Sequence, residues 1–165
     1  MRLPFVEPLT PIAPGPRTVP EPPRRGEAGG EECGICQQDE GVWSDANWVL
    51  HNPVGGSLPG TMWLASRAHA DSFADLPDDL ATDFGRVVAR IERAILSVGD
   101  IARVHVYRWG DGSAHFHVWF YPRPLGMLEA RREMLPLWAE LMPEAPKEAV
   151  ADAEAKIAAA MAAGI

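Results

Sequence analysis

The chain has 165 residues, 47% of them hydrophobic, which suffices for one buried core but not for two full domains. Its formal charge of −8 argues against a nonspecific nucleic-acid-binding protein, although a small cationic pocket for a phosphate is compatible with it. No apolar run reaches the length of about 18 residues that a membrane span requires. The N-terminus lacks the continuous apolar stretch of a signal peptide, so we expect a cytoplasmic protein.

Residues 1–32 are rich in proline and end in a stretch of glycine and glutamate. This composition cannot build a core of its own, and it predicts a flexible or polyproline-like arm. We expect the folded domain to span residues 33–124. Residues 125–165 are expected to form a helical extension that packs on it.

Short runs of aromatic and β-branched residues predict strands at residues 41–44, 47–51 and 61–66, the first two as a hairpin. Residues 52–60 are rich in proline and glycine and predict a loop. An amphipathic helix is predicted over residues 77–98, because apolar residues recur there at steps of three and four. A fourth strand is predicted over residues 101–109, with Val104 and Val106 on the core side.

The last predicted strand begins at His115 and alternates with period two. His115, His117, Trp119 and Tyr121 share one face, and the phenylalanine and valine residues between them share the other. One face is therefore expected to join the core and the other to carry the chemistry.

After residue 124 the chain is expected to form a broken helix or a long loop, because Pro136 interrupts an apolar stretch. An alanine-rich helix is predicted over residues 146–161. Five strands with tight turns, except across one long helix, predict an α+β fold with an antiparallel sheet.

Four candidate metal ligands lie far apart in the sequence: Cys33, Cys36, His69 and His115. Two thiolates and two neutral imidazoles make a closed tetrahedral site, the usual composition of a structural zinc site. In a reducing compartment the Cys-x-x-Cys spacing favours a metal or redox role over a structural disulfide. The alternatives are a redox pair or two reduced cysteines.

His117 is the candidate nucleophile. An imidazole with one nitrogen held by a backbone carbonyl can attack phosphorus through the other and form a covalent nucleotidyl intermediate. Backbone N–H groups of residues 110–113, the Ser113 hydroxyl and Arg123 are candidates to stabilise the phosphoryl oxygens. The alternatives are a plain turn for Ser113 and a solvated charge for Arg123. His51 and His105 lack a partner pattern.

Several segments together resemble the histidine-triad (HIT) superfamily, including its branch related to galactose-1-phosphate uridylyltransferase. They are Cys33-Gly-Ile-Cys36, residues 59–69 from Pro-Gly-Thr to Arg-Ala-His, Phe73-Ala-Asp-Leu76, and residues 115–123, His-Phe-His-Val-Trp-Phe-Tyr-Pro-Arg. The resemblance implies a HIT-like five-stranded antiparallel sheet with one long helix, usually in a homodimer. It also implies binding of nucleoside phosphates and reaction at the α-phosphate through a histidine nucleotidyl intermediate.

By the same resemblance, His117 is the nucleophile of the triad. His115, Cys33, Cys36 and His69 match the zinc ligands of the zinc-bearing members. Asn52 is the nearest match to the acidic residue that typically holds the ribose.

The main departure from the family pattern is Trp119, which stands where the triad has its third histidine. An indole offers one N–H donor and much bulk. Three functions therefore remain open: a nucleotidyl hydrolase or transferase in which the indole tunes substrate choice, a zinc-stabilised nucleotide-binding module with little turnover, and a structural partner-binding protein.

Overall fold

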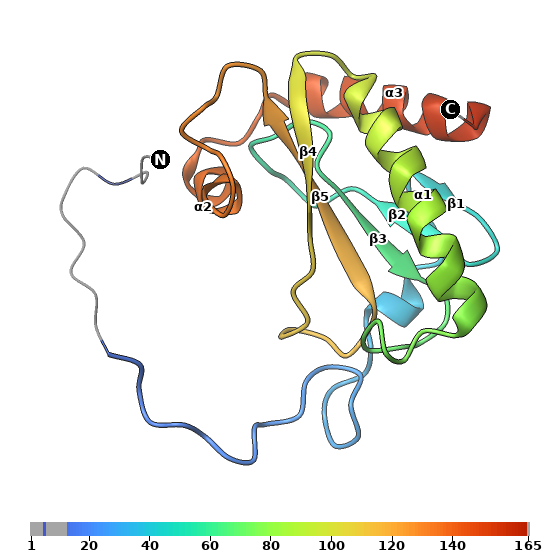
Figure 1. Cartoon of the computed structure of the whole chain (residues 1–165), viewed down its shortest axis with the longest axis vertical. Coiled ribbons are helices and arrows are strands. Elements are labelled where there is room, and N and C mark those ends of the chain that lie inside the picture. The colour runs from blue at the N-terminus through green and yellow to red at the C-terminus, as the bar shows by residue number, and fades with distance from the viewer. Residues whose placement is uncertain (1–4, 6–12, 165) are drawn as a thin grey trace.

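All five strands form one antiparallel sheet in the order β1-β2-β3-β5-β4 (Figure 1). The computed structural model describes residue 5 and residues 13–164. The strands are β1 (Trp43–Ser44), β2 (Trp48–His51), β3 (Met62–Ser66), β4 (Ile101–Tyr107) and β5 (His117–Pro124). The helices are α1 (Asp78–Leu96), α2 (Met134–Leu141) and α3 (Lys147–Ala163), with a 3-10 turn at Ile35–Gln37 (η1). The predicted α+β class with a five-stranded antiparallel sheet and one long helix is confirmed.

Helices α1 and α3 cover one face of the sheet. Val87, Ile91 and Ile95 of α1 are fully buried and belong to one cluster with Ile157 and Met161 of α3. The sheet contributes Leu50, Met62, Leu64, Val118 and Phe120 to the same cluster. Each such side chain removed from water stabilises the fold by roughly 1.5–3 kcal/mol. This apolar packing leaves the opposite face of the sheet free for other roles.

Strand β5 alternates as its sequence predicts. Phe116, Val118 and Phe120 are at most 1% exposed on the core face, whereas His117 and Trp119 are half-buried on the other. The strand runs to Pro124, further than expected. Its prolines are tolerated because the last pair between β3 and β5 is Met62 with Phe120, so beyond it β5 has only β4 as a partner.

Strand β4 is an edge strand, and its register shifts between Ile101 and Arg103. Val104 packs against the core as predicted, but Val106 is 43% exposed. Val106 lies opposite the buried Phe120 and hence on the core side, as predicted, but it stays exposed because an edge strand has a neighbour on one side only.

The chain after β5 forms a loop and then α2, which packs on the open face of the sheet. Pro136 lies in the first turn of α2, where a missing backbone N–H is tolerated. Leu135 of this helix is fully buried in a second cluster with Leu58, Tyr121 and Ala130. Helix α2 therefore covers part of the face that α1 and α3 leave open.

Residues 1–4 and 6–12 of the predicted arm lie outside the described residues. Closer to the domain, residues 24–31 form a turn in which Gly26 N–H donates to the Glu31 carbonyl (2.8 Å). The Arg24 guanidinium donates to the Asp71 carboxylate (2.6 Å) and to the carbonyl of Gly110 (2.6 Å). Figure 1 shows the chain reaching the domain through this turn, just before η1. None of the helices in the described residues has the length and apolar character needed to cross a membrane.

Candidate functional site

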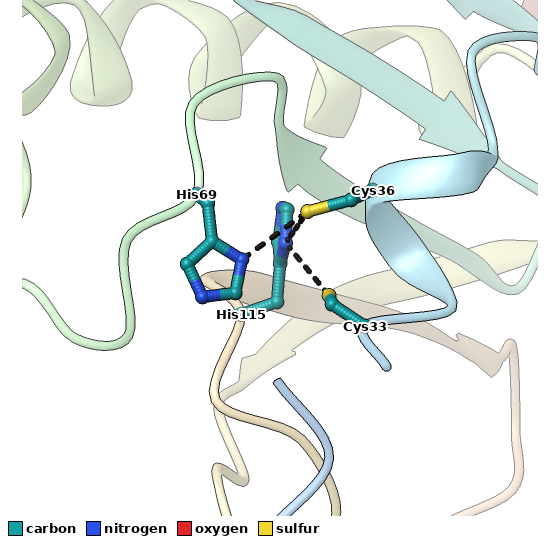
Figure 2. A group of neighbouring side chains, drawn as sticks. All are labelled: Cys33, Cys36, His69 and His115. Carbon is teal, nitrogen blue, oxygen red and sulfur yellow. Dashed lines mark hydrogen bonds between the residues drawn. The ribbon is translucent and has the colours of Figure 1, made fainter. Parts of the chain in front are cut away.

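Two cysteines and two histidines converge at the end of β3 and the start of β5 (Figure 2). The ligand atoms of Cys33, Cys36, His69 and His115 lie within 4.8 Å of one another. Cys33 and Cys36 come from η1 and the residues before it, and His69 follows β3. The structure thus brings together the four residues that the sequence predicts as zinc ligands.

The hydrogen bond of His115 fixes which nitrogen faces the cluster. Its Nε2–H donates to the carbonyl of Ser66 (2.7 Å), so in the neutral ring Nδ1 carries the lone pair. Both cysteine sulfurs lie 3.3 Å from that Nδ1. One lone pair cannot accept two good hydrogen bonds, whereas a cation satisfies all four ligand atoms at once. A backbone carbonyl behind a ligand histidine is also the usual support of a metal site.

The environment suits ligation by neutral imidazole. Burial lowers the pKa of His115, and the neighbouring His69 and His117 act in the same direction. Desolvation raises the pKa of the Cys36 thiol to about 11, with Cys33 adding to the effect. A coordinated cation reverses this preference and holds the thiolate form. The residues present therefore fit a tetrahedral zinc ion.

His117 lies two residues after His115, on the open face of β5. Its Nδ1–H donates to the carbonyl of His115 (2.7 Å). In the neutral ring Nε2 then carries an available lone pair. The ring packs edge-on against Trp63 at 6.4 Å between centroids. The orientation of the His117 ring is thus fixed by the backbone of a residue that is itself a predicted metal ligand.

A row of aromatic side chains crosses the open face beside His117. Strand register places His51 opposite Trp63, Trp63 opposite Trp119, and Trp119 opposite Tyr107. His51 stacks on Trp63 at 4.0 Å, and Trp63 lies 6.2 Å from Trp119. Trp119 therefore extends an aromatic surface that begins next to His117.

A cavity of about 280 Å³ adjoins Trp119. Its walls are the 53–58 loop, Trp119 and Tyr121 of β5, and residues 139–144. Ser57 donates to the Ala139 carbonyl (2.7 Å), which holds two of these walls together. Two carboxylates, Glu140 and Glu144, line the same cavity. The size approaches that of small-ligand pockets, and an aromatic wall suits a planar ring.

Ser113 contacts the segment that precedes the cysteines. Its hydroxyl donates to the carbonyl of Arg25 (3.3 Å), and the N–H of Ala114 donates to the same oxygen (2.8 Å). Arg25 and Ser113 form an isolated parallel bridge. Ser113 thus fixes the 24–31 turn to the loop before β5, and its role toward a phosphate stays a prediction.

Two predicted ligand residues have hydrogen-bond partners of their own within the chain. The Asn52 amide donates to the carboxylate of Glu154 (2.7 Å) on α3, which lies on the other side of the sheet from His117. Arg123 lies six residues beyond His117, about 20 Å along the strand. Its guanidinium donates to the carbonyls of Pro124 and Met127 (3.3 Å each). The roles of Asn52 and Arg123 toward a ligand stay predictions.

Sequence reasoning missed Trp63, Tyr107 and the two glutamates of the cavity. Period two places Trp63 on the same face as Ala65, but its position opposite Trp119 depends on strand register. Glu140 and Glu144 reach the site only because α2 folds back over the open face. Their sequence positions carry no signal of that placement.

The described geometry is that of a HIT-like α+β fold with a Cys/His cluster at the end of the sheet. No family profile and no curated protein sequence matches the chain. Among solved structures, a zinc-bound histidine-triad family protein from Mycobacterium smegmatis matches with a TM-score of 0.57 and 19% identity, covering 79% of this chain and 94% of that one.

Two further structures are similar. A hypothetical histidine-triad nucleotide-binding protein from Sulfolobus tokodaii strain 7 has a TM-score of 0.59 and 16% identity, covering 79% of this chain and 93% of that one. A HIT-like protein of Bartonella henselae involved in cell-cycle regulation has a TM-score of 0.58 and 15% identity, covering 76% of this chain and 91% of that one. At these identities the comparisons show the fold alone.

Proposed function

We propose that the chain binds a nucleoside phosphate on the open face of its sheet and catalyses hydrolysis or transfer at the α-phosphate. The observation that carries the proposal is the hydrogen bond from His117 Nδ1–H to the His115 carbonyl. It leaves Nε2 as the attacking atom. The HIT-like fold and a solved relative described as nucleotide-binding support the choice of ligand.

In the first step Nε2 of His117 attacks the α-phosphorus, and the bond from phosphorus to the leaving group breaks. The leaving group departs with the electron pair and takes a proton from solvent, and the water that attacks in the second step returns one proton to solvent. The His117 ring keeps its Nδ1 proton, and the His115 carbonyl stabilises the positive charge that the ring acquires. Water then attacks phosphorus and releases the nucleotide and neutral His117.

Trp119 and the adjoining cavity are the proposed base site. His117 and Trp119 are two residues apart on one strand face, hence about 7 Å apart, a separation that a nucleoside monophosphate spans. The indole offers a stacking surface, and Glu140 or Glu144 is placed to accept hydrogen bonds from ligand hydroxyl or amino groups. In this interpretation Trp119 changes substrate choice and leaves the nucleophile intact.

Zinc is proposed as a structural cofactor held by Cys33, Cys36, His69 and His115. When bound, it joins residues 33–36 to the ends of β3 and β5, and supplies no step of the reaction. His115 links the two sites, because its side chain belongs to the cluster while its carbonyl orients His117.

The proposal is tested by mixing the zinc-loaded protein with an adenosine 5′-phosphoramidate, quenching rapidly, and measuring intact mass. We expect an adduct of one adenylyl group on the wild-type chain, localised by peptide mapping to His117. Saturable binding of AMP, followed by tryptophan fluorescence, should accompany it. Absence of both the adduct and product would refute catalysis, and absence of AMP binding would refute the nucleotide site.

Trp119 favours a second candidate, a zinc-stabilised nucleotide-binding module without turnover. An indole cannot replace the third histidine as a proton donor to a departing oxygen. The same experiment separates the two functions, because this candidate predicts AMP binding without adduct or product.

We further propose a homodimer formed through the β4 edge, with Val106 at the contact. The edge is unpaired within the described residues, and Val106 is 43% exposed on it. Light scattering after size exclusion should give twice the chain mass of 18.0 kDa. Val106→Lys should give monomers, since an edge charge opposes strand pairing, while Leu128→Lys, at a 54% exposed leucine outside β4, should not. A wild-type monomer at all concentrations would contradict the dimer.

A further inference from the structure

A second pocket lies on the open face of the sheet, at the far end of β5 from His117. It has a volume of about 410 Å³ and is lined by Arg103, His105, Arg123, Arg131 and Arg132. We call it the arginine pocket. Arg123 is six residues beyond His117, so the two sites are about 20 Å apart along the strand. The arginine pocket lies nearer to the proposed base site, because Tyr121 of that cavity pairs with His105, but the two pockets share no lining residue.

The charge of the arginine pocket is unusual for this chain. Four of the 15 lysine and arginine residues meet there, although the formal net charge is −8. In the described part of the chain, none of the four takes part in an ion pair. Glu133, whose charge acts on Tyr107, does not line the pocket. The positive charges are thus concentrated without internal neutralisation.

The strand register forces two of these charges together. Arg103 on β4 lies directly opposite Arg123 on β5, and like charges in such a pair are destabilising. Arg123 is only 8% exposed, which adds a desolvation cost. Burial, followed by the charge of Arg123, lowers the pKa of His105 beside them. A bound anion would relieve the repulsion between Arg103 and Arg123.

The remaining two arginines are presented by a fixed turn. Arg132 has a left-handed backbone with φ of 59°, uncommon for a residue other than glycine. The Tyr107 hydroxyl donates to its carbonyl (2.7 Å) and ties the turn to β4. Arg131 is held by its Nε donating to the Leu128 carbonyl (2.8 Å).

The guanidinium groups keep most of their donors available. Within the described residues, Arg103 donates to the Ala102 carbonyl (2.6 Å), and Arg123 donates to the carbonyls of Pro124 and Met127. Each guanidinium has five N–H donors in a fork that matches phosphate oxygens. Four such groups around one space suit a ligand with several adjacent negative charges.

We propose that the arginine pocket binds a linear polyphosphate group, carried either by free inorganic polyphosphate or by the polyphosphate tail of a nucleotide. A single monovalent anion cannot neutralise four guanidinium groups, whereas a triphosphate chain can. The pocket goes beyond the proposed function, because it needs neither His117 nor the zinc cluster.

Calorimetric titration of the zinc-loaded protein with sodium tripolyphosphate tests the proposal, with zinc content measured before and after. We expect saturable binding of one tripolyphosphate per chain, at least tenfold weaker in Arg103→Gln/Arg132→Gln. That variant should melt no lower than wild type, because it removes mutually repelling charges. Arg93→Gln is the matched control, because Arg93 is an exposed arginine on α1, which covers the opposite face of the sheet. This variant should bind tripolyphosphate like the wild type.

Further ligands identify the source of the phosphate. ATP binding that weakens in the double variant, with AMP binding unchanged, would assign the pocket to a nucleotide tail. Tripolyphosphate binding with no such effect on ATP would assign it to the free polyphosphate. His117→Ala should retain tripolyphosphate binding, which separates this site from the proposed function.

Three results would overturn the proposal. They are no saturable binding of tripolyphosphate or ATP by the wild type, equal loss in Arg93→Gln, and an RNA oligonucleotide that binds more tightly than tripolyphosphate through the same arginines.

Discussion

His117→Ala is expected to lower the turnover of an adenosine 5′-phosphoramidate by at least about 10³-fold, because it removes the only atom proposed to attack phosphorus. That factor corresponds to about 4 kcal/mol of lost transition-state stabilisation. The substitution should leave AMP binding within severalfold of wild type, since the proposed base site at Trp119 is untouched. Steady-state kinetics and a binding titration on the same preparations measure the two effects.

The structural controls for this variant are zinc content and melting temperature. His117 is half-buried and outside the Cys/His cluster, so both should stay close to wild type. Arg93→Ala, at an exposed residue of α1 on the other side of the sheet, should retain full turnover. Unchanged turnover in His117→Ala would rule out covalent catalysis at this residue.

Local patterns were sufficient to predict the sheet and the long helix. The period-two alternation after His115 separates Phe116, Val118 and Phe120 from the side chains of the open face, and the burial in the structure follows it. The three- and four-residue steps between residues 77 and 98 likewise locate α1 to within two residues at each end. In both cases the signal lies within a single element, where burial on one side imposes the period.

Contacts between elements were harder to predict. The convergence of the four candidate metal ligands was assumed from their residue types, and the structure brings them together. Asn52 and Arg123 were chosen by their positions in a sequence pattern. Asn52 donates a hydrogen bond to Glu154 across the edge of the sheet. Arg123 lies far along β5 in the arginine pocket, which only the pairing of β4 and β5 reveals. Register and the path of α2 over the sheet depend on the whole fold.

Loss of the zinc site is expected to destabilise the domain strongly. None of the side chains of η1 is buried. The Cys/His cluster is therefore the main attachment of residues 33–36 to β3 and β5. Zinc binding contributes about 10–16 kcal/mol to the folding of small zinc-finger peptides. We expect a smaller contribution to the stability of this domain, because α1, α3 and the sheet form a core without the metal. A loss of about 3–5 kcal/mol lowers the melting temperature by roughly 10 °C in a chain of this size.

Cys36→Ser and His69→Ala test this expectation, because both residues are exposed and their replacement leaves no core cavity. Each variant should contain less than one zinc per chain by elemental analysis and melt roughly 10 °C below wild type. Arg93→Gln, at an exposed residue of α1 remote from the cluster, should change neither value. A strong chelator should lower the melting temperature of the wild type but not that of the variants, since the metal it removes is already absent. A wild type that carries stoichiometric zinc and melts identically with and without chelator would show that the metal does not hold the fold together.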